Sequence, residues 1–511
     1  MSTIKNKLIG IAVVVGVCCS SCNSWLDVTP QGQVEAEELY ETAKGCNSAL
    51  GGIYYILTSS TLYGQNLSFG MMDALAQYYE PVVSTNTNHT YYELSLYNFD
   101  YASNVSRFNS VWSSMYQAIT ECNAFIHYLE PNASRIEYAD LMLGEAYALR
   151  AFIHMELFEM FGPVVRTKSD LQKKAIAYRN EFDVTARLFN TGDEVLDYAE
   201  TDLQKALELL KGDPIKSYGR RGDANESLLD YYEVLNYRGG RMNYFCALGL
   251  LSRLEMLRLN KDEAYSYALR VIEEAKNVIS LIDKRGIETT SEMGKDLNYS
   301  TEMLGAFYVN DMYTLTNAIF RMEGDPAGTN YATPITTNSY EQIMTDIYGR
   351  DPDGSGTDNR FRYWFERQNS ESEEVYYNFK KLKKAYDGGA SSLGYYPEIP
   401  IMRMSEIYYI ACESQIGKNN ELALGYLNDV RRTRNLPDIE GPLDDAVIKE
   451  YLVRDARKDF IGEGRMFLMY KRMFYEIYVK DGKIIAPAES HFVFPIPDDE
   501  YEYTDNVKPE N

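Results

Sequence analysis

The stretch "GEAYALRAFIHMELFEMFGP", residues 144–163, decides the fold class, because its apolar residues follow helical spacing along two separate stripes. The stripes consist of Ala146, Leu149, Ile153, Leu157 and Met160 on one side and of Tyr147, Ala151, Met155 and Phe158 on the other. A helix with two apolar stripes is covered on both sides, so it lies inside a layered stack of helices. Gly162 followed by Pro163 ends this helix.

Helical hairpins of the same kind recur along the chain. Residues 108–130 carry apolar side chains at helical spacing, and residues 193–210 provide a further helix. The stretches 242–275 and 404–434 each consist of a helix, a tight polar turn and a second helix. Units of about 34 residues built in this way resemble tetratricopeptide repeats. The sequence therefore predicts a mainly α fold, with tetratricopeptide-like helical hairpins forming a scaffold.

Long irregular stretches interrupt the hairpins near residues 78–104, 211–240 and 276–400, and they are rich in Tyr, Asn, Gly and Thr. Loops of this length within a compact protein usually carry function or local strands. The scaffold is therefore expected to bear a large, loop-rich and variable half.

The N-terminus has the shape of a secretory signal. Two lysines precede ten apolar residues at 8–17, a run too short to span a membrane, which takes roughly 20 residues. Cys22, which follows two serines, resembles the cysteine that receives the lipid when a bacterial lipoprotein signal is cut. The alternatives are a plain cleaved signal with incidental cysteines, or a thiolate metal site with Cys18 and Cys19. A metal site would need a second C-x2-C pair, which the sequence lacks.

These features predict the organisation of the whole chain. Residues 1–21 form a lipoprotein signal peptide and residues 22–35 a lipidated tether. Residues 36–511 form a single globular body, with an N-terminal helical part over about 36–210 and a loop-rich and C-terminal helical part over about 211–511.

The composition excludes one class of partner. The formal net charge of −24 repels phosphate backbones, and no basic cluster with interleaved aromatic residues offsets it, so nucleic-acid binding is not expected. The remaining cysteines are too few for a disulfide framework in a chain of 511 residues, and we expect them to be small core residues. These are Cys46, Cys122, Cys246 and Cys412.

Catalysis finds little support in the sequence. The four histidines are scattered and no H-E-x-x-H, G-x-S-x-G or phosphate-binding loop is present, so no catalytic residue is predicted. His154 is expected to pack or to form hydrogen bonds. A glycoside hydrolase needs only two suitably spaced carboxylates, and with 75 Asp and Glu residues an exported enzyme of that class stays an alternative.

One segment offers a weak calcium site. "DPDGSGTDNR", residues 351–360, begins like an EF-hand loop with Asp351 and Asp353, but its twelfth position is Arg362 in place of the bidentate Glu. A Ca²⁺ ion would need a further carboxylate such as Asp358. The other interpretation is a solvated turn, and no other cofactor is expected.

Two segments offer the groups that bind sugars. Sugar binding requires an aromatic ring against the apolar face of the pyranose and polar groups for the hydroxyls. The candidates are Tyr91, Tyr92, Tyr97 and Asn98 in the stretch 85–101, and Arg360 and Trp364 in "RFRYW" at 360–364. Structural roles for the same residues are the alternative. Trp112 is expected in the core.

The helix "LRAFIHMELFEMFGPVV", residues 149–165, closely resembles a segment of the SusD/RagB family of outer-membrane nutrient-binding lipoproteins. Other segments resemble the family in the same order along the chain, at 22–32, 107–126, 396–414 with 427–437, 453–472 and 492–501. The resemblance implies a SusD-like fold in which tetratricopeptide-like hairpins bear a loop-rich, ligand-binding half, as the periodicity also indicates.

The resemblance also implies a function. Family members are anchored by lipid at the cell surface, on the outer membrane, where they cover a SusC-like TonB-dependent transporter and capture oligosaccharides or, in some cases, peptides. We therefore expect a non-enzymatic binding protein whose partners are a glycan, a SusC-like transporter and the membrane that holds its lipid anchor. A peptide receptor and an exported glycoside hydrolase are the alternatives.

Overall fold

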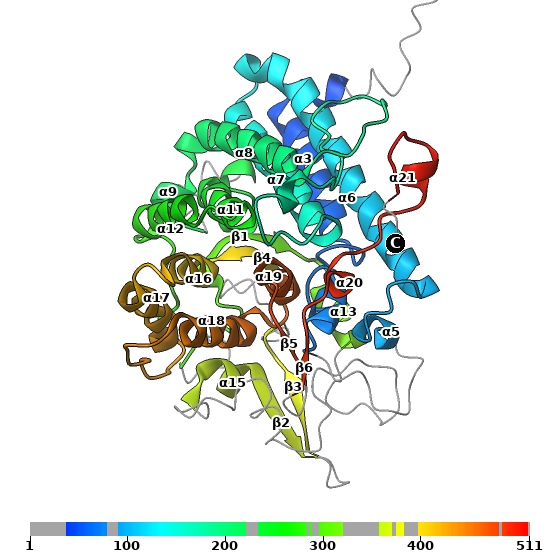
Figure 1. Ribbon diagram of the computed structural model, residues 1–511. Coiled ribbons are helices and arrows are strands. Elements are labelled where there is room, and N and C mark those ends of the chain that lie inside the picture. The colour runs from blue at the N-terminus through cyan, green and yellow to red at the C-terminus, as the bar shows by residue number, and fades with distance from the viewer. Residues whose placement is uncertain are drawn as a thin grey trace, which may run out of the picture.

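The computed structural model describes residues 37–78, 90–220, 233–283, 287–288, 296–319, 357–369, 375–382, 397–479 and 483–508. The predicted signal peptide, the predicted lipidation site Cys22, and the calcium candidates Asp351 and Asp353 lie outside these ranges. The described part of the chain is mainly helical, as predicted (Figure 1).

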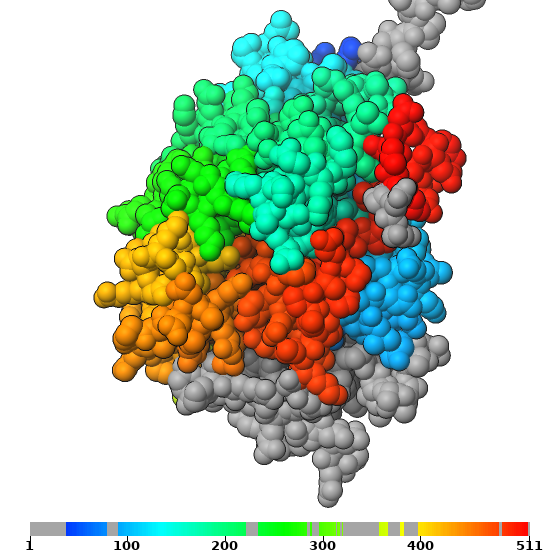
Figure 2. Space-filling model, in the orientation of Figure 1, coloured from blue at the N-terminus to red at the C-terminus, as the bar shows by residue number. Residues whose placement is uncertain are grey.

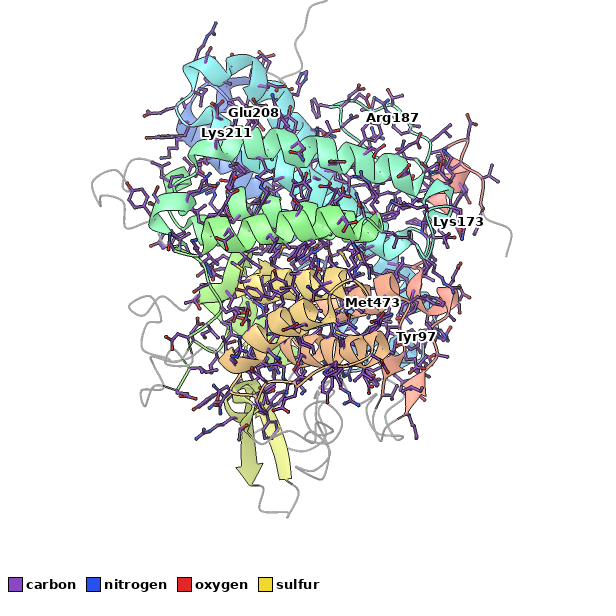
Figure 3. The ribbon with its side chains drawn as sticks, turned by 60° about the vertical axis from the view of Figure 1, so that its left-hand side comes forward. Tyr97, Lys173, Arg187, Glu208, Lys211 and Met473 are labelled. Atoms are coloured by element: carbon purple, nitrogen blue, oxygen red, sulfur yellow. The ribbon has the colours of Figure 1, made fainter. Side chains whose placement is uncertain are left out.

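The N-terminal layers are built from four helices. They are α3 (Ala43–Leu57), α6 (Ala102–Leu129), α7 (Ala139–Phe161) and α8 (Gly192–Leu209). Helix α7 packs against both α6 and α8, and nearly all of its residues are buried. This confirms that its two apolar stripes are both covered. Figure 3 shows α8 in the upper part of the stack, with Glu208 near its C-terminal end and Lys211 directly after it.

The stack continues with helices from the second half of the chain. They are α11 (Tyr244–Leu257), α12 (Lys261–Ala275), α16 (Met404–Gln415), α17 (Asn420–Thr433), α18 (Asp445–Phe460) and α19 (Arg465–Met473). Helix α11 packs on α8 and α12, and α12 packs on α16. The predicted hairpins at 242–275 and 404–434 are thereby confirmed. In the space-filling view the two groups of helices meet along a closely packed boundary (Figure 2).

Local capping explains where two of these helices begin. Thr191 Oγ1 accepts a hydrogen bond from the Glu194 amide at 3.2 Å, and Glu194 Oε2 accepts one from the Thr191 amide at 2.7 Å. This reciprocal capping box starts α8. Asn243 caps α11 by accepting from the Cys246 amide at 3.0 Å, and its amide nitrogen donates to the Leu304 carbonyl at 2.6 Å. The Asn243 cap thus joins a helix to a strand far along the chain.

Short antiparallel strands lie in the stretch for which loops or local strands were predicted. Strand β1 (Met303–Tyr308) pairs with β4 (Glu398–Arg403), with Tyr308 opposite Glu398. This ladder lies between α11 and α12 on one side and α16 and α18 on the other (Figure 1). A second pair in that stretch is β2 (Phe365–Asn369) with β3 (Val375–Phe379). A third pair, β5 (Ile477–Tyr478) with β6 (Ile484–Ile485), lies outside the predicted stretches.

Short helices connect these elements. The α-helical ones are α4 (Met71–Leu75), α5 (Tyr92–Ser95), α9 (Ile215–Tyr218), α13 (Met312–Ile319), α15 (Asn359–Trp364), α20 (Glu489–Phe492) and α21 (Asp499–Glu502). The 3-10 helices are η1 (Glu130–Arg135), η2 (Asp170–Gln172), η3 (Leu210–Gly212), η4 (Glu233–Leu235), η5 (Arg238–Gly240) and η8 (Ser300–Glu302). Across the described ranges, no helix is both long and apolar enough to cross a membrane.

The core contains the residues that were expected there. All four cysteines of the globular body are buried and unpaired, and Trp112 is buried with its Nε1 donating to Glu500 Oε1 at 2.9 Å. His154 Nε2 accepts from the Arg179 amide at 3.0 Å, so its Nδ1 donates to the Arg150 carbonyl at 2.8 Å. Burial lowers the pKa of His154 to about 3, which keeps the ring neutral in this hydrogen-bonding role.

Candidate ligand-binding pocket

A pocket of about 620 Å³ opens where the irregular stretches 211–240 and 276–400 meet. Its lining comes from α9 and the residues after it, from η5, from the chain that follows α12, from η8, and from Glu398 at the start of β4. The volume lies within the range of roughly 300–1,000 Å³ that is usual for small-molecule sites. The pocket is therefore large enough for a saccharide unit.

Two tyrosines stand at this pocket with much of their rings exposed. Tyr218 ends α9 and is 54% exposed, and Tyr237 precedes η5 and is 57% exposed. Tyr237 has a φ of 49°, and Tyr299, next to the lining residue Ser300, has a φ of 52°. Residues with side chains hold such backbone angles only when the surrounding structure imposes them, and they concentrate at functional sites.

An ion pair forms the polar floor of the pocket. Arg220 Nη2 lies 2.8 Å from Glu398 Oε2, and both side chains are largely buried. The Arg220 guanidinium also donates to the carbonyls of Ser300 and Gly239, and the Glu398 carbonyl accepts from Asn298 Nδ2 at 2.6 Å. Backbone carbonyls therefore hold the Arg220 guanidinium in place, and the Asn298 side chain holds the backbone of Glu398.

Two glycines make room for this pair. A Cβ atom at Gly239 would lie 2.4 Å from Arg220 Nε, which is far too close, and one at Gly240 would lie 3.2 Å from Glu398 Oε1. The absence of side chains at both positions lets η5 pass directly over the ion pair.

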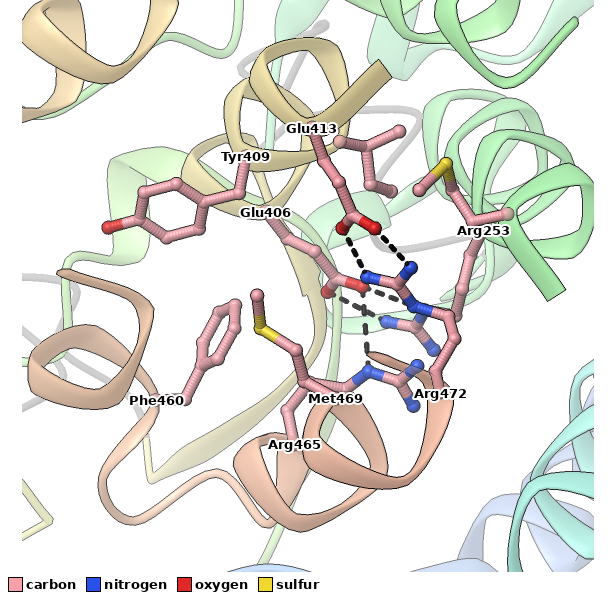
Figure 4. Close-up of a pocket in the computed structure, with 10 residues that line it drawn as sticks. Arg253, Glu406, Tyr409, Glu413, Phe460, Arg465, Met469 and Arg472 are labelled. Carbon is pink, nitrogen blue, oxygen red and sulfur yellow. Dashed lines mark hydrogen bonds and ion pairs between the residues drawn. The ribbon is translucent and has the colours of Figure 1, made fainter. Parts of the chain in front are cut away.

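A second cavity, of about 20 Å³, lies inside the molecule and has room for roughly one water (Figure 4). Arg472 Nη2 lies 2.6 Å from Glu413 Oε2, Arg253 Nη2 lies 2.8 Å from Glu406 Oε2, and Arg465 Nε lies 3.5 Å from Glu406 Oε1. These pairs join α11, α16 and α19. Because its charged groups are matched and it is so small, we assign this cavity to the packing of the helices.

The predicted sugar-binding residues around α5 lie on the opposite side of the molecule from α9 (Figure 1). Tyr91 is buried, with its hydroxyl accepting from Gln65 Nε2 at 3.0 Å. Tyr97 is half-buried and donates to the Leu75 carbonyl at 2.7 Å. Tyr92 is half-buried, and Asn98 is exposed with its Nδ2 donating to Glu93. The structure thus leaves surface for a ligand mainly at Tyr92 and Asn98.

Arg360 and Trp364 lie in the core. Arg360 Nη2 is 2.7 Å from Asp358 Oδ2, and Arg360 Nη1 is 3.1 Å from Asp459 Oδ1. Trp364 donates from Nε1 to the Leu297 carbonyl at 2.7 Å, and the ammonium nitrogen of Lys381 lies 4.2 Å from its ring centroid. Both side chains are fully buried, so in the structure neither offers surface to a ligand.

The calcium candidates are only partly described. Asp358 is buried and caps α15 by accepting a hydrogen bond from the Arg360 amide at 2.9 Å. Its carboxylate also forms an ion pair with the Arg360 guanidinium. Its two partners in the prediction, Asp351 and Asp353, are outside the described residues. Across the residues that are described, no group of three or more His, Cys, Asp or Glu side chains could hold a metal ion. Calcium binding stays a prediction.

The pocket lies within stretches where function was expected, but none of its residues was singled out from the sequence. A usable signal was present in "SYGR" at 217–220 and "NYRGG" at 236–240. Each places a tyrosine beside glycine, which combines a stacking face with free space. Arg220 of the first stretch adds a hydrogen-bond donor, whereas Arg238 of the second is fully buried.

Comparison with known families gives two matches to this chain. Residues 25–221 match a family described as starch-binding and associating with the outer membrane. Residues 365–507 match the SusD family, also called SusD/RagB. Between them the two matches cover the N-terminal layers, the closing helices and the C-terminal segment.

Individual proteins are similar to the chain at low sequence identity. The SusD-like protein P25 of Formosa agariphila is 23% identical over 205 residues, which span 39% of this chain and only 38% of that relative. A SusD-like carbohydrate-binding protein from Bacteroides vulgatus superposes with a TM-score of 0.63 at 16% identity, over 90% of this chain and 96% of its own. A SusD superfamily protein from Bacteroides fragilis gives 0.62 at 17% identity, over 92% and 99%. The two solved structures show that the fold is shared.

Proposed function

Because the chain belongs to the SusD/RagB family, we propose that it is a cell-surface, lipid-anchored binding protein that captures oligosaccharides. It delivers them to a SusC-like TonB-dependent transporter in the outer membrane. The family description for residues 25–221, starch-binding in association with the outer membrane, supports both the ligand class and the location.

The observation that carries the ligand class is the pocket with Tyr218, Tyr237 and the Arg220–Glu398 pair. Exposed tyrosine rings provide flat apolar faces, and the lining adds hydroxyl, amide, guanidinium and carboxylate groups. This mixture matches a pyranose, which has an apolar face and a rim of hydroxyls.

The pocket also favours binding over catalysis. Glycoside hydrolysis uses two carboxyl groups, roughly 5 to 9.5 Å apart on either side of the scissile bond. Among the described residues that line the pocket, Glu398 is the one carboxylate, and it is paired with Arg220. We therefore propose a receptor without enzymatic activity.

The test is a glycan array probed with the full chain purified in detergent, followed by titration calorimetry of each oligosaccharide that binds. Replacing Tyr218 and Tyr237 together by alanine should weaken binding by at least tenfold, about 1.4 kcal/mol, because two stacking faces are lost. Tyr503→Ala is the control, since Tyr503 is an even more exposed tyrosine near the C-terminus.

Three outcomes would contradict the proposal in different ways. An array without binders, together with peptides that co-purify with the protein, would favour the peptide receptor. Repeated release of new reducing ends from a bound glycan would favour the hydrolase. Binding that survives the loss of both tyrosines would place the ligand elsewhere on the molecule.

A further inference from the structure

Glu398 presents one carboxylate oxygen to the pocket. The residue is only 6% exposed, yet it lines the cavity. Its Oε2 is paired with Arg220 at 2.8 Å, whereas its Oε1 accepts no hydrogen bond within the described part of the chain. Oε1 lies beside Gly240, where a Cβ atom would come within 3.2 Å of it. Because Oε1 faces the open pocket, a ligand hydroxyl that donates to it would take the place of a water molecule there.

The charges of the pocket are already balanced before a ligand enters. Arg220 is matched by Glu398, and its guanidinium is further engaged by two backbone carbonyls. Lys276, the other cation among the described lining residues, is exposed and paired with Glu273 at 2.9 Å. An anionic group placed at Glu398 Oε1 would therefore meet a buried like charge in a protein of net charge −24. A cationic group would be attracted by the Glu398 carboxylate and repelled by the Arg220 guanidinium.

Among the described residues, the rest of the polar lining is uncharged. Ser217, Asn277, Ser280, Ser300 and Thr301 supply hydroxyl and amide groups, which can both donate and accept. A sugar hydroxyl has the same dual capacity. The lining therefore complements a ring that carries hydroxyls and no formal charge.

We propose that this pocket selects uncharged sugar units, with a ring hydroxyl donating to Glu398 Oε1, and rejects sugars that carry carboxylate or sulfate groups. The inference rests on the proposed function in one respect, that the ligand is a glycan. It adds that Glu398 determines the class of glycan.

The experiment compares each neutral oligosaccharide that binds with a derivative whose primary hydroxyls have been oxidised to carboxylates. The two probes share linkage, length and ring configuration and differ in charge. With the full chain purified in detergent, calorimetry should show the oxidised probe binding on the order of tenfold more weakly, or worse, at low salt.

Glu398→Gln keeps the size of the side chain and removes its charge. The substitution should reduce the difference in affinity between the neutral and the oxidised probe, chiefly because the oxidised probe binds more tightly. Glu502→Gln removes one exposed negative charge far from the pocket, near the C-terminus, and should leave that difference unchanged.

The possible results separate the two proposals. Equal binding of neutral and oxidised probes to the wild-type protein, or an array whose binders are mainly acidic glycans, would overturn the selectivity while leaving glycan capture in place. The selectivity would also be overturned if Glu398→Gln and Glu502→Gln changed the affinity difference between the two probes equally. An array without any binder would remove the proposed function, and the selectivity with it.

Discussion

At the scale of single residues, Gly239 decides whether Arg220 can occupy the floor of the pocket. A Cβ atom there would lie 2.4 Å from Arg220 Nε and 2.5 Å from Arg220 Cβ, so the arginine must move. Gly239→Ala should therefore weaken glycan binding roughly tenfold, measured by calorimetry. Gly212→Ala is the control, because a Cβ at Gly212 meets nothing within 4 Å. Unchanged affinity in Gly239→Ala would show that the position of Arg220 does not matter for binding.

Lys471 is a second residue whose surroundings lead to a measurable consequence. Its ammonium group is buried and donates to the carbonyls of Gly162 at 2.7 Å and Met160 at 3.3 Å. Burial lowers the pKa of Lys471 to about 7 from its ordinary value of 10.5, although Glu159 and Glu489 raise it in part. A folded-state pKa below the unfolded one means that stability is present at high pH and is lost as the pH falls towards 7.

Lys471→Met should remove this pH dependence. Between pH 9 and pH 6.5, the free energy of unfolding of the wild-type protein should fall by about 2 to 3 kcal/mol more than that of the variant. Denaturant unfolding at both pH values measures the difference. The exposed Lys211, replaced in the same way, should behave as the wild type (Figure 3). Parallel pH curves for the wild type and Lys471→Met would contradict the assignment.

At the scale of elements, the β1–β4 ladder places an exposed tyrosine next to a residue of the pocket. Tyr308 on β1 is the register partner of Glu398 on β4. Directly opposed residues of an antiparallel pair share a face, so Tyr308, which is 47% exposed, lies beside the carboxylate of the pocket. A chain that fills the pocket and continues along this face would meet the Tyr308 ring.

Tyr308→Ala should therefore weaken the binding of long oligosaccharides more than the binding of short ones. The loss of one aromatic contact corresponds to about 1 kcal/mol, or roughly fivefold, for a ligand long enough to reach the ring. Calorimetry with a length series of the best binder, from disaccharide to hexasaccharide, measures the effect, and Tyr503→Ala serves again as the control. An equal loss at every length would place Tyr308 outside the path of the chain.

At the scale of the whole molecule, the proposed anchor joins the binding body to the membrane through Cys22, which lies outside the described residues. Each buried methylene of an acyl chain contributes about 0.8 kcal/mol to membrane binding, so several chains together hold a protein firmly. Cys22→Ala should move the protein from the membrane fraction to the soluble fraction. The comparison is made by fractionating cells and washing membranes with high salt. A variant that stays with washed membranes would contradict the anchor.

The sequence by itself determined the helical scaffold and part of the core. Apolar spacing along residues 144–163 predicted that α7 is covered on both sides, and the same signal located α11 with α12 and α16 with α17. Helical periodicity is readable because it depends on residues three and four positions apart. The core placements of Trp112 and of the four cysteines followed from the same local pattern.

Only the tertiary structure decided where polar and aromatic residues face. Arg360 and Trp364 have the chemistry of a sugar site, but packing places them against Asp459 and Leu297 in the core. Arg220 and Glu398 meet although 178 positions separate them in the chain. The same polar and aromatic side chains can pack in the core or bind a ligand. Their role depends on which distant segments fold against them, and the local spacing of residues does not contain that information.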